Sequence, residues 1–114
     1  MVSKSLVAAS SKPLILGILK KGKSYGYAII QEVKELSGGV LEWSDGMLYP
    51  VLHKLEKEGL IASEWILSDE ERPRKYYRIT EKGKASLVEE KQQWMSVHQA
   101  LATLWAIQSS PHSS

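Results

Sequence analysis

The chain has 114 residues, of which 43% are hydrophobic and 25% charged, with a formal net charge of +2 and no cysteine. These values are typical of one globular domain, and they exclude disulfides and thiolate metal sites. No apolar run approaches the roughly 18 residues of a membrane span and no signal-peptide layout is present, so we expect no contact with a membrane. The absence of cysteine favours a reducing, cytoplasmic setting.

The charges are distributed unevenly along the chain. Residues 1–24 carry five lysines and no acid, residues 72–84 carry six bases and one acid, and residues 64–71 carry four acids and no base. Basic clusters separated by an acidic segment suggest a polyanion partner met by particular surfaces. The alternative is a solvated surface with uneven charge.

The first helix is predicted from Lys12 to a stop at Gly22, since Pro13 suits its first turn and glycine suits a helix end. Residues 1–11 are small, polar and basic, and we expect a flexible arm or a short helical lead-in there. The apolar residues of the segment share one helical face: Leu14, Ile15, Ile18 and Leu19.

A second helix is predicted from an N-cap at Ser24 to a stop at Gly38 and Gly39. Its apolar residues recur at helical spacing: Tyr25, Ile29, Val33 and Leu36. Gly26 in the first turn costs roughly 1 kcal/mol relative to alanine. A closely crossing backbone would explain it.

The third helix is predicted between an N-cap at Ser44 and a stop at Gly59. One face is apolar and suits a small core: Leu48, Val51, Leu52 and Leu55. The opposite face combines small, aromatic and hydrogen-bonding groups without an acid: Gly46, Tyr49, Pro50, His53 and Lys57, with Lys54 on its flank. Pro50 lies beyond the first turn and should tighten the helix locally.

After Gly59 the pattern changes from helical to extended. Residues 60–67 and 75–79 read as two strands of a β-hairpin, and residues 68–73 form the charged turn between them. Because Tyr76 and Tyr77 alternate, we expect one of them in the core. Three helices followed by a two-stranded wing predict an α+β, mainly helical fold, the winged helix-turn-helix, over residues 12–79.

A winged helix places its third helix in the major groove of DNA, and its hairpin reaches the backbone or the neighbouring minor groove. Tyrosine, histidine and a capping serine can meet bases or phosphates, while lysine and arginine supply the salt-dependent affinity. Plain solvated charge is an equal alternative for Lys54 and Lys57, and His53 fits a surface residue better than a metal ligand. The candidate DNA-binding residues are Ser44, Gly46, Tyr49, Pro50, His53, Lys54, Arg72, Arg74 and Lys75.

The last predicted helix covers residues 80–108, begins at an N-cap on Thr80 and is longer than a small core requires. Residues 109–114 are expected to be flexible. Apolar residues at seven-residue spacing suggest that a second copy of this helix packs on the first. The candidate dimer interface consists of Leu87, Trp94, Leu101, Leu104 and Trp105.

The four tryptophans fall into two groups. Trp43 and Trp65 lie beside the third helix and in the first strand, where packing is the expected role. Trp94 and Trp105 share a face of the last helix. Dimer packing and a slot for a flat aromatic ligand explain them equally well.

Catalysis has no support in the sequence. No Gly-rich phosphate loop follows a strand, no nucleophile elbow or metal motif appears, and no cysteine is present. We therefore expect neither an enzyme nor a bound cofactor.

Three blocks in order, LILGILKKGKSYGYAIIQEVKE, LYPVLHKLEKEGLI and RPRKYYRITEKG, resemble the PadR family of bacterial transcriptional regulators over residues 14–83. The resemblance implies a winged-helix repressor that binds double-stranded operator DNA as a homodimer. Residues 25–27 match the second-helix signature of the family, residues 48–50 its recognition-helix signature and residues 74–77 its wing. Asp45 replaces a proline common in the family.

A single helix after the wing resembles the short subclass that includes multidrug-sensing regulators. In that subclass a tryptophan of the last helix stacks on planar ligands between subunits, and Trp94 matches its place. The resemblance therefore implies a planar aromatic or hydrophobic effector, and the candidate ligand-binding residues are Trp94, Val97 and His98. Such an effector would favour a dimer whose recognition helices are not about 34 Å apart. The alternative function is a winged-helix protein-interaction module that does not bind DNA.

Overall fold

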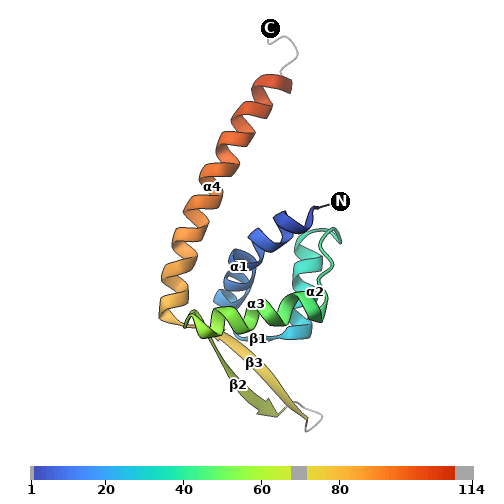
Figure 1. Ribbon diagram of the computed structural model, residues 1–114, viewed down its shortest axis with the longest axis vertical. Coiled ribbons are helices and arrows are strands. Elements are labelled where there is room, and N and C mark those ends of the chain that lie inside the picture. Colours follow the sequence, from blue (N-terminus) through green and yellow to red (C-terminus); the bar gives the residue numbers. More distant parts are fainter. Residues whose placement is uncertain (1, 68–71, 110–114) are drawn as a thin grey trace.

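The computed structural model describes residues 2–67 and 72–109, which form an elongated molecule of 64 × 28 × 22 Å. A small domain of three helices and a sheet lies at one end, and a long final helix projects from it (Figure 1). The wing leaves this domain at the end opposite the free end of the helix. The elements are α1 Lys4–Lys21, β1 Ser24–Tyr25, α2 Gly26–Leu36, α3 Asp45–Lys57, β2 Ile61–Leu67, β3 Pro73–Ile79 and α4 Glu81–Ser109.

Helix α1 begins at Lys4, whereas the sequence predicted a helix from Lys12, preceded over residues 1–11 by a flexible arm or a short helical lead-in. The Ser3 hydroxyl accepts a hydrogen bond from the backbone N–H of Leu6, which is the cap that the prediction missed. Pro13 consequently lies inside the helix rather than in its first turn. Of the two expectations for residues 1–11, residues 4–11 follow the helical lead-in and not the flexible arm.

The predicted N-cap Ser24 instead belongs to a short strand. Ser24 and Tyr25 pair with Tyr77 and Tyr76 of β3, so the wing becomes a three-stranded antiparallel sheet in the order β1-β3-β2. Helix α2 begins at Gly26 after Tyr25, whose side chain makes no cap hydrogen bond. Ser24, which the local sequence predicted to be a helix cap, instead pairs with β3 in the sheet.

The core fills the space between α1, α2, α3 and the base of the sheet. Its largest fully buried side chains include Ile15, Ile29, Leu48, Leu52 and Tyr77. Helix α3 has the predicted bounds, with the Ser44 hydroxyl accepting a hydrogen bond from the Met47 N–H at 3.3 Å. The apolar face predicted for α3 is therefore the face that anchors it to the domain.

The hairpin of β2 and β3 extends beyond the core as the wing. Its register pairs Ile61 with Ile79 at the base and Leu67 with Pro73 at the outer end. Tyr77 is 1% exposed, which confirms that one of the two adjacent tyrosines is in the core. Most of the predicted turn over residues 68–73 lies outside the described residues.

The root of α4 is tightly held by the domain. The Thr80 hydroxyl accepts a hydrogen bond from the Gly83 N–H at 3.0 Å, as predicted for the N-cap, and donates one to the Gly59 carbonyl oxygen at 2.7 Å. A Cβ on Gly83 would lie 2.0 Å from the Leu60 carbonyl oxygen, so only glycine permits this close packing. Lys82 adds a bond to the Glu58 carbonyl oxygen at 2.9 Å. The residues predicted to be flexible beyond Ser109 lie outside the described part.

Among the helices that the structure describes, none combines the length and apolar character needed to cross a membrane.

Candidate nucleic-acid interface

The outward face of α3 carries most of the residues predicted to contact DNA. Ser44 precedes the helix as its cap, and the side chains that point away from the core are exposed. Asp45, in the first turn, complements the positive end of the helix dipole. The exposed set contains Gly46, Pro50, His53, Lys54 and Lys57. These residues form one solvent-facing strip along the helix, from which hydrogen-bond donors can reach a groove of DNA.

Tyr49 differs from the rest of this face because it is partly buried and packs against the core. A Cβ on Gly26 would lie 2.2 Å from the Tyr49 hydroxyl oxygen and 2.8 Å from the ring carbon that bears it. Glycine is therefore required at position 26 because the Tyr49 ring occupies the space that a Cβ would fill. The prediction that a crossing backbone explains this glycine is wrong. The contact joins the start of α2 to α3 and sets the position of the recognition helix.

The wing presents its basic residues on an aromatic support. The Arg74 guanidinium lies 4.1 Å from the centre of the Tyr25 ring, and Tyr25 contacts Tyr76 edge-on at 5.3 Å between ring centres. The Lys75 ammonium lies 5.6 Å from the centre of the Tyr77 ring. Cation–π contacts of this kind hold a cation in place while it stays accessible. Arg72 is exposed just before β3.

A groove of about 390 Å³ brings the wing and the helices together. It unites the predicted residues Tyr49, Arg74 and Lys75, which come from parts of the chain more than 20 positions apart. Its remaining lining residues are Tyr25, Gly26, Tyr27, Trp65 and Pro73. No acid is among these residues, so the groove combines positive charge with aromatic surface.

Sequence reasoning did not assign the other five lining residues to the DNA-binding surface, and Trp65 and Tyr27 are the two of them with the largest exposed side chains. Trp65 was predicted to be packed, yet it is 67% exposed, so that prediction is wrong. Tyr27 was named only as part of a family signature and is 66% exposed. The companion prediction for Trp43 is confirmed, because that side chain is 6% exposed within the core. Tryptophan is usually buried, and the sequence contains no signal that distinguishes the buried Trp43 from the exposed Trp65.

Beneath the groove, Tyr77 has an unusual environment. Burial raises the pKa of its phenol, and Tyr49 and Glu56 nearby raise the pKa further. Its hydroxyl has no hydrogen-bond partner within the described residues. Glu56 instead accepts a hydrogen bond from the Ser63 hydroxyl at 2.5 Å, which ties α3 to β2. Tyr77 is therefore a neutral core group on which the wing rests.

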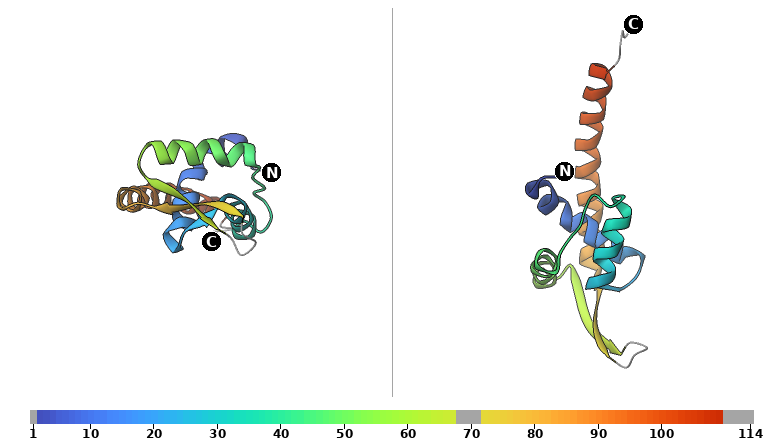
Figure 2. Two further views of the ribbon diagram at one scale, coloured as in Figure 1. Left: turned by 90° about the horizontal axis from the view of Figure 1, so that it is seen from below. Right: turned by 90° about the vertical axis from the view of Figure 1, so that its right-hand side faces the viewer.

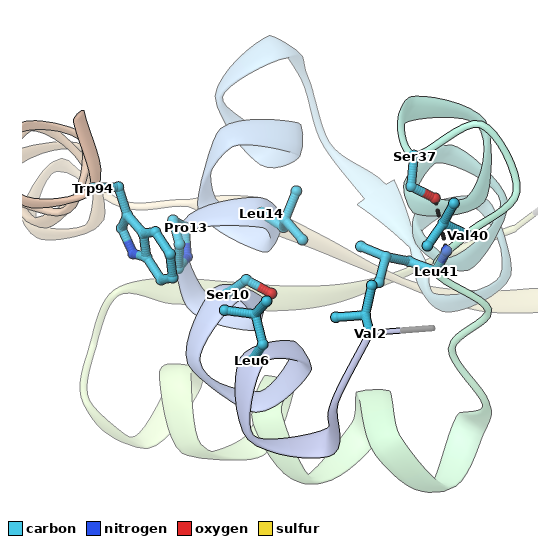
Figure 3. Close-up of a pocket in the computed structure, with 9 residues that line it drawn as sticks. All are labelled: Val2, Leu6, Ser10, Pro13, Leu14, Ser37, Val40, Leu41 and Trp94. Carbon is cyan, nitrogen blue, oxygen red and sulfur yellow. Dashed lines mark hydrogen bonds between the residues drawn. The ribbon is translucent and has the colours of Figure 1, made fainter. Parts of the chain in front are cut away.

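The second candidate site surrounds Trp94, on the opposite side of α1 from the wing. Trp94 of α4 lies beside Pro13 of α1, and a groove of about 590 Å³ continues to the segment after α2, as Figure 3 shows. In that segment the Ser37 hydroxyl accepts a hydrogen bond from the Leu41 N–H at 2.9 Å. The lining is apolar apart from two serines: Val2, Leu6, Ser10, Pro13, Leu14, Ser37, Val40, Leu41 and Trp94.

Two of the three predicted ligand residues do not belong to this groove. Val97 and His98 are exposed further along α4 and are absent from its lining. Trp94 also borders a second groove of about 590 Å³, between α1 and the first half of α4. The structure therefore places Trp94 alone of the three against apolar surface of the domain.

The predicted dimer residues before and after Trp94 differ in their exposure to solvent. Leu87 is partly buried against the core of its own domain. The second half of α4 extends away from the rest of the domain, as the ribbon views in Figure 2 show. The large apolar side chains that follow Trp94 on this helix are exposed. These exposed residues are Met95, Val97, Leu101, Leu104, Trp105 and Ile107.

Within the residues described by the structure, no cluster of histidine and acidic side chains has the arrangement of a metal site.

Sequence comparisons place this geometry among known proteins. The family model described as "Transcriptional regulator PadR-like family" matches residues 15–89. The chain is 31% identical over 101 residues to uncharacterized protein X of Lysinibacillus sphaericus, covering 89% of this chain and 93% of that protein. It is 33% identical over 90 residues to the negative transcriptional regulator PadR of Bacillus subtilis, covering 79% of this chain. The match spans 47% of that relative, about half its length.

Solved structures agree with the fold. A PadR-like transcriptional regulator from Bacillus cereus superposes with a TM-score of 0.79 at 30% identity, covering 90% of this chain and 97% of that one. A transcriptional regulator from Clostridium thermocellum gives a TM-score of 0.80 at 25% identity with the same coverage of both chains. The winged helix with one long C-terminal helix is thus an architecture shared over nearly the full length of these proteins.

Proposed function

This chain belongs to the PadR-like family of transcriptional regulators, and we propose that it is a repressor that binds operator DNA as a homodimer in the cytoplasm. The family consists of DNA-binding transcription regulators, so the sequence prediction that the chain is not an enzyme is confirmed. The Bacillus subtilis relative is named a negative regulator, which favours repression as the direction of control.

The observation that carries the proposal is the groove between α3 and the wing. It joins Tyr49 of the recognition helix to Arg74 and Lys75 of the wing. No ion pair among the described residues engages either wing cation. Two cations without an ion-pair partner among the described residues, beside a groove with no acid in its described lining, provide the phosphate contacts that give DNA binding most of its affinity.

The DNA proposal is tested with the fragment upstream of the gene that encodes this chain, in a mobility-shift assay over a range of salt concentrations. We expect His53→Ala combined with Arg74→Ala to weaken binding on the order of tenfold or more, because one group faces the bases and the other the phosphates. Lys91→Ala removes a lysine from α4 and is the charge-matched control. Equal affinities for the double variant and the control would refute DNA binding through this surface.

A homodimer is proposed because α4 exposes an apolar stripe for which its own domain offers no cover. Val97, Leu101 and Leu104 are exposed and follow one another at intervals of four and three residues, the spacing at which two helices pack along a seam. Burying one large apolar side chain stabilises by about 1.5–3 kcal/mol, so several such side chains from two chains suffice for a stable pair. Two recognition helices held one DNA turn apart would then read two half-sites.

We also propose that a planar aromatic or hydrophobic effector binds beside Trp94. The apolar groove of Figure 3 supports this, because Trp94 offers an indole face next to Pro13 and Leu14. The test is a fluorescence titration with planar aromatic cations, comparing wild type with Trp94→Phe. We expect quenching that the variant largely loses. Identical titration curves for both proteins would contradict an effector site at Trp94.

A further inference from the structure

The wing carries an exposed indole that the residues predicted for DNA binding do not include. Trp65 is 67% exposed and Leu67, two residues further along the same face of β2, is 69% exposed. Trp65 pairs across the sheet with Lys75, and both line the groove that Tyr49 also borders. An apolar ring thus lies within the most basic part of the wing.

Among the described residues, the core does not extend far enough along β2 to cover this ring. The same face of β2 is buried at Ile61 and becomes progressively exposed toward the outer end, so Trp65 lies beyond the core. An exposed large apolar surface beside unpaired cations suggests a partner that combines negative charge with apolar surface. The sugar–phosphate backbone of DNA has both, because each phosphate is flanked by deoxyribose rings.

We propose that this groove holds the backbone of one operator strand and that Trp65 packs its indole against a deoxyribose there. The proposal rests on the DNA-binding function proposed above. Side chains directly opposite on neighbouring strands have their Cβ atoms about 4.5–5.5 Å apart. A sugar on Trp65 and the adjoining phosphate on Lys75 are therefore within the span of one nucleotide, and Tyr27 lies across the same groove.

Packing on the backbone is favoured over insertion of the indole between bases. The segment that joins β2 to β3 contains Asp69, Glu70 and Glu71 in succession. Carboxylates repel phosphates, so the acidic composition of this part of the sequence disfavours its deep entry into the minor groove. The cations at Arg74 and Lys75 lie further along the chain toward the domain, where only the nearer strand is in reach.

The salt dependence of the DNA affinity distinguishes the proposed roles of Trp65 and Lys75, which pair across the sheet. A lysine on a phosphate releases counterions, so its removal lowers the slope of log K against log salt by about 0.9. An apolar ring on a sugar releases none. Its removal therefore lowers the affinity by the same factor at every salt concentration and leaves the slope unchanged.

The experiment measures fluorescence anisotropy of the labelled upstream fragment with wild type, Trp65→Ala, Trp65→Phe, Lys75→Ala and the control Leu36→Ala, an exposed apolar residue of α2 outside the groove. We expect Trp65→Ala to bind about tenfold more weakly with an unchanged slope, and Trp65→Phe to recover most of the loss. Lys75→Ala should change the slope. DNA should also shield wild type from acrylamide quenching more than Trp65→Phe, a readout that does not depend on the folding of the alanine variant.

Several results would overturn the inference. Trp65→Ala and Leu36→Ala binding equally would remove Trp65 from the interface, while the DNA-binding function would stand. A change of slope with Trp65→Ala would mean that the indole acts through a cation. Loss of self-association in sedimentation, with DNA affinity unchanged, would make the surface a protein interface. Absence of any binding by wild type would overturn both proposals.

Discussion

Replacing Gly26 with alanine tests the contact that sets the recognition helix against α2. The new Cβ would lie 2.2 Å from the Tyr49 hydroxyl oxygen, whereas an ordinary contact is about 3.5 Å, so the ring must shift by more than about 1 Å. Overpacking of this kind costs about 1–3 kcal/mol, and the better helix propensity of alanine returns at most about 1 kcal/mol. We expect a net loss near 1 kcal/mol and a Tm lower by about 4 °C.

Urea unfolding and operator binding of Gly26→Ala provide the measurement. The matched control is Gly17→Ala in α1, where no atom lies within 4 Å of the new Cβ, so helix propensity acts alone and should raise stability by up to about 1 kcal/mol. Tyr49→Phe removes the closest atom and should make Gly26→Ala less damaging in a double-mutant cycle. If Gly26→Ala stabilises the protein as much as Gly17→Ala does, the close approach does not constrain the recognition helix.

Three further changes have expected outcomes. Tyr77→Phe removes a buried hydroxyl without a partner among the described residues and should raise stability by about 1 kcal/mol in urea unfolding. Because the folded-state pKa of Tyr77 is raised, the wild type should lose stability as the pH rises above about 10, and the variant should lose less. Gly83→Ala places a Cβ 2.0 Å from the Leu60 carbonyl oxygen and should cost at least about 2 kcal/mol in thermal unfolding, as no flexible side chain can yield. Leu101→Asp with Leu104→Asp should raise the dimer dissociation constant at least about 100-fold in sedimentation, whereas a wild-type sedimentation profile would contradict the seam.

The sequence was sufficient for the elements whose signals are local. The cap at Ser44, the cap at Thr80 and the apolar face of α3 all have the predicted place. Ser24 was misassigned because its cap signal competed with pairing to Tyr77, which lies more than 50 residues away and leaves no trace near Ser24. Pairing between distant strands is a tertiary effect that local propensity does not contain.

Which side chains are buried could be predicted from the sequence only in part. Trp65 and Ile61 lie on one face of β2, but the position at which the core ends along that face depends on where α3 stops covering the sheet. Gly26 posed the same problem. The sequence shows that Gly26 lowers the stability of a helix, but its contact with Tyr49 is seen only when α2 and α3 pack together.

The rigid root of α4 limits how an effector at Trp94 would act on DNA. Gly83 packs on the Leu60 carbonyl, and Thr80 bonds to Gly59, so α4 and the base of the wing move together. The Lys12–Glu90 ion pair, at 3.8 Å, adds a link from α4 to α1 closer to Trp94. A ligand beside Trp94 therefore has little freedom to bend α4 within one chain. We expect it to change the angle between the two proposed copies of α4, and with it the distance between recognition helices, because the described contacts hold the root of α4 firmly to its own domain.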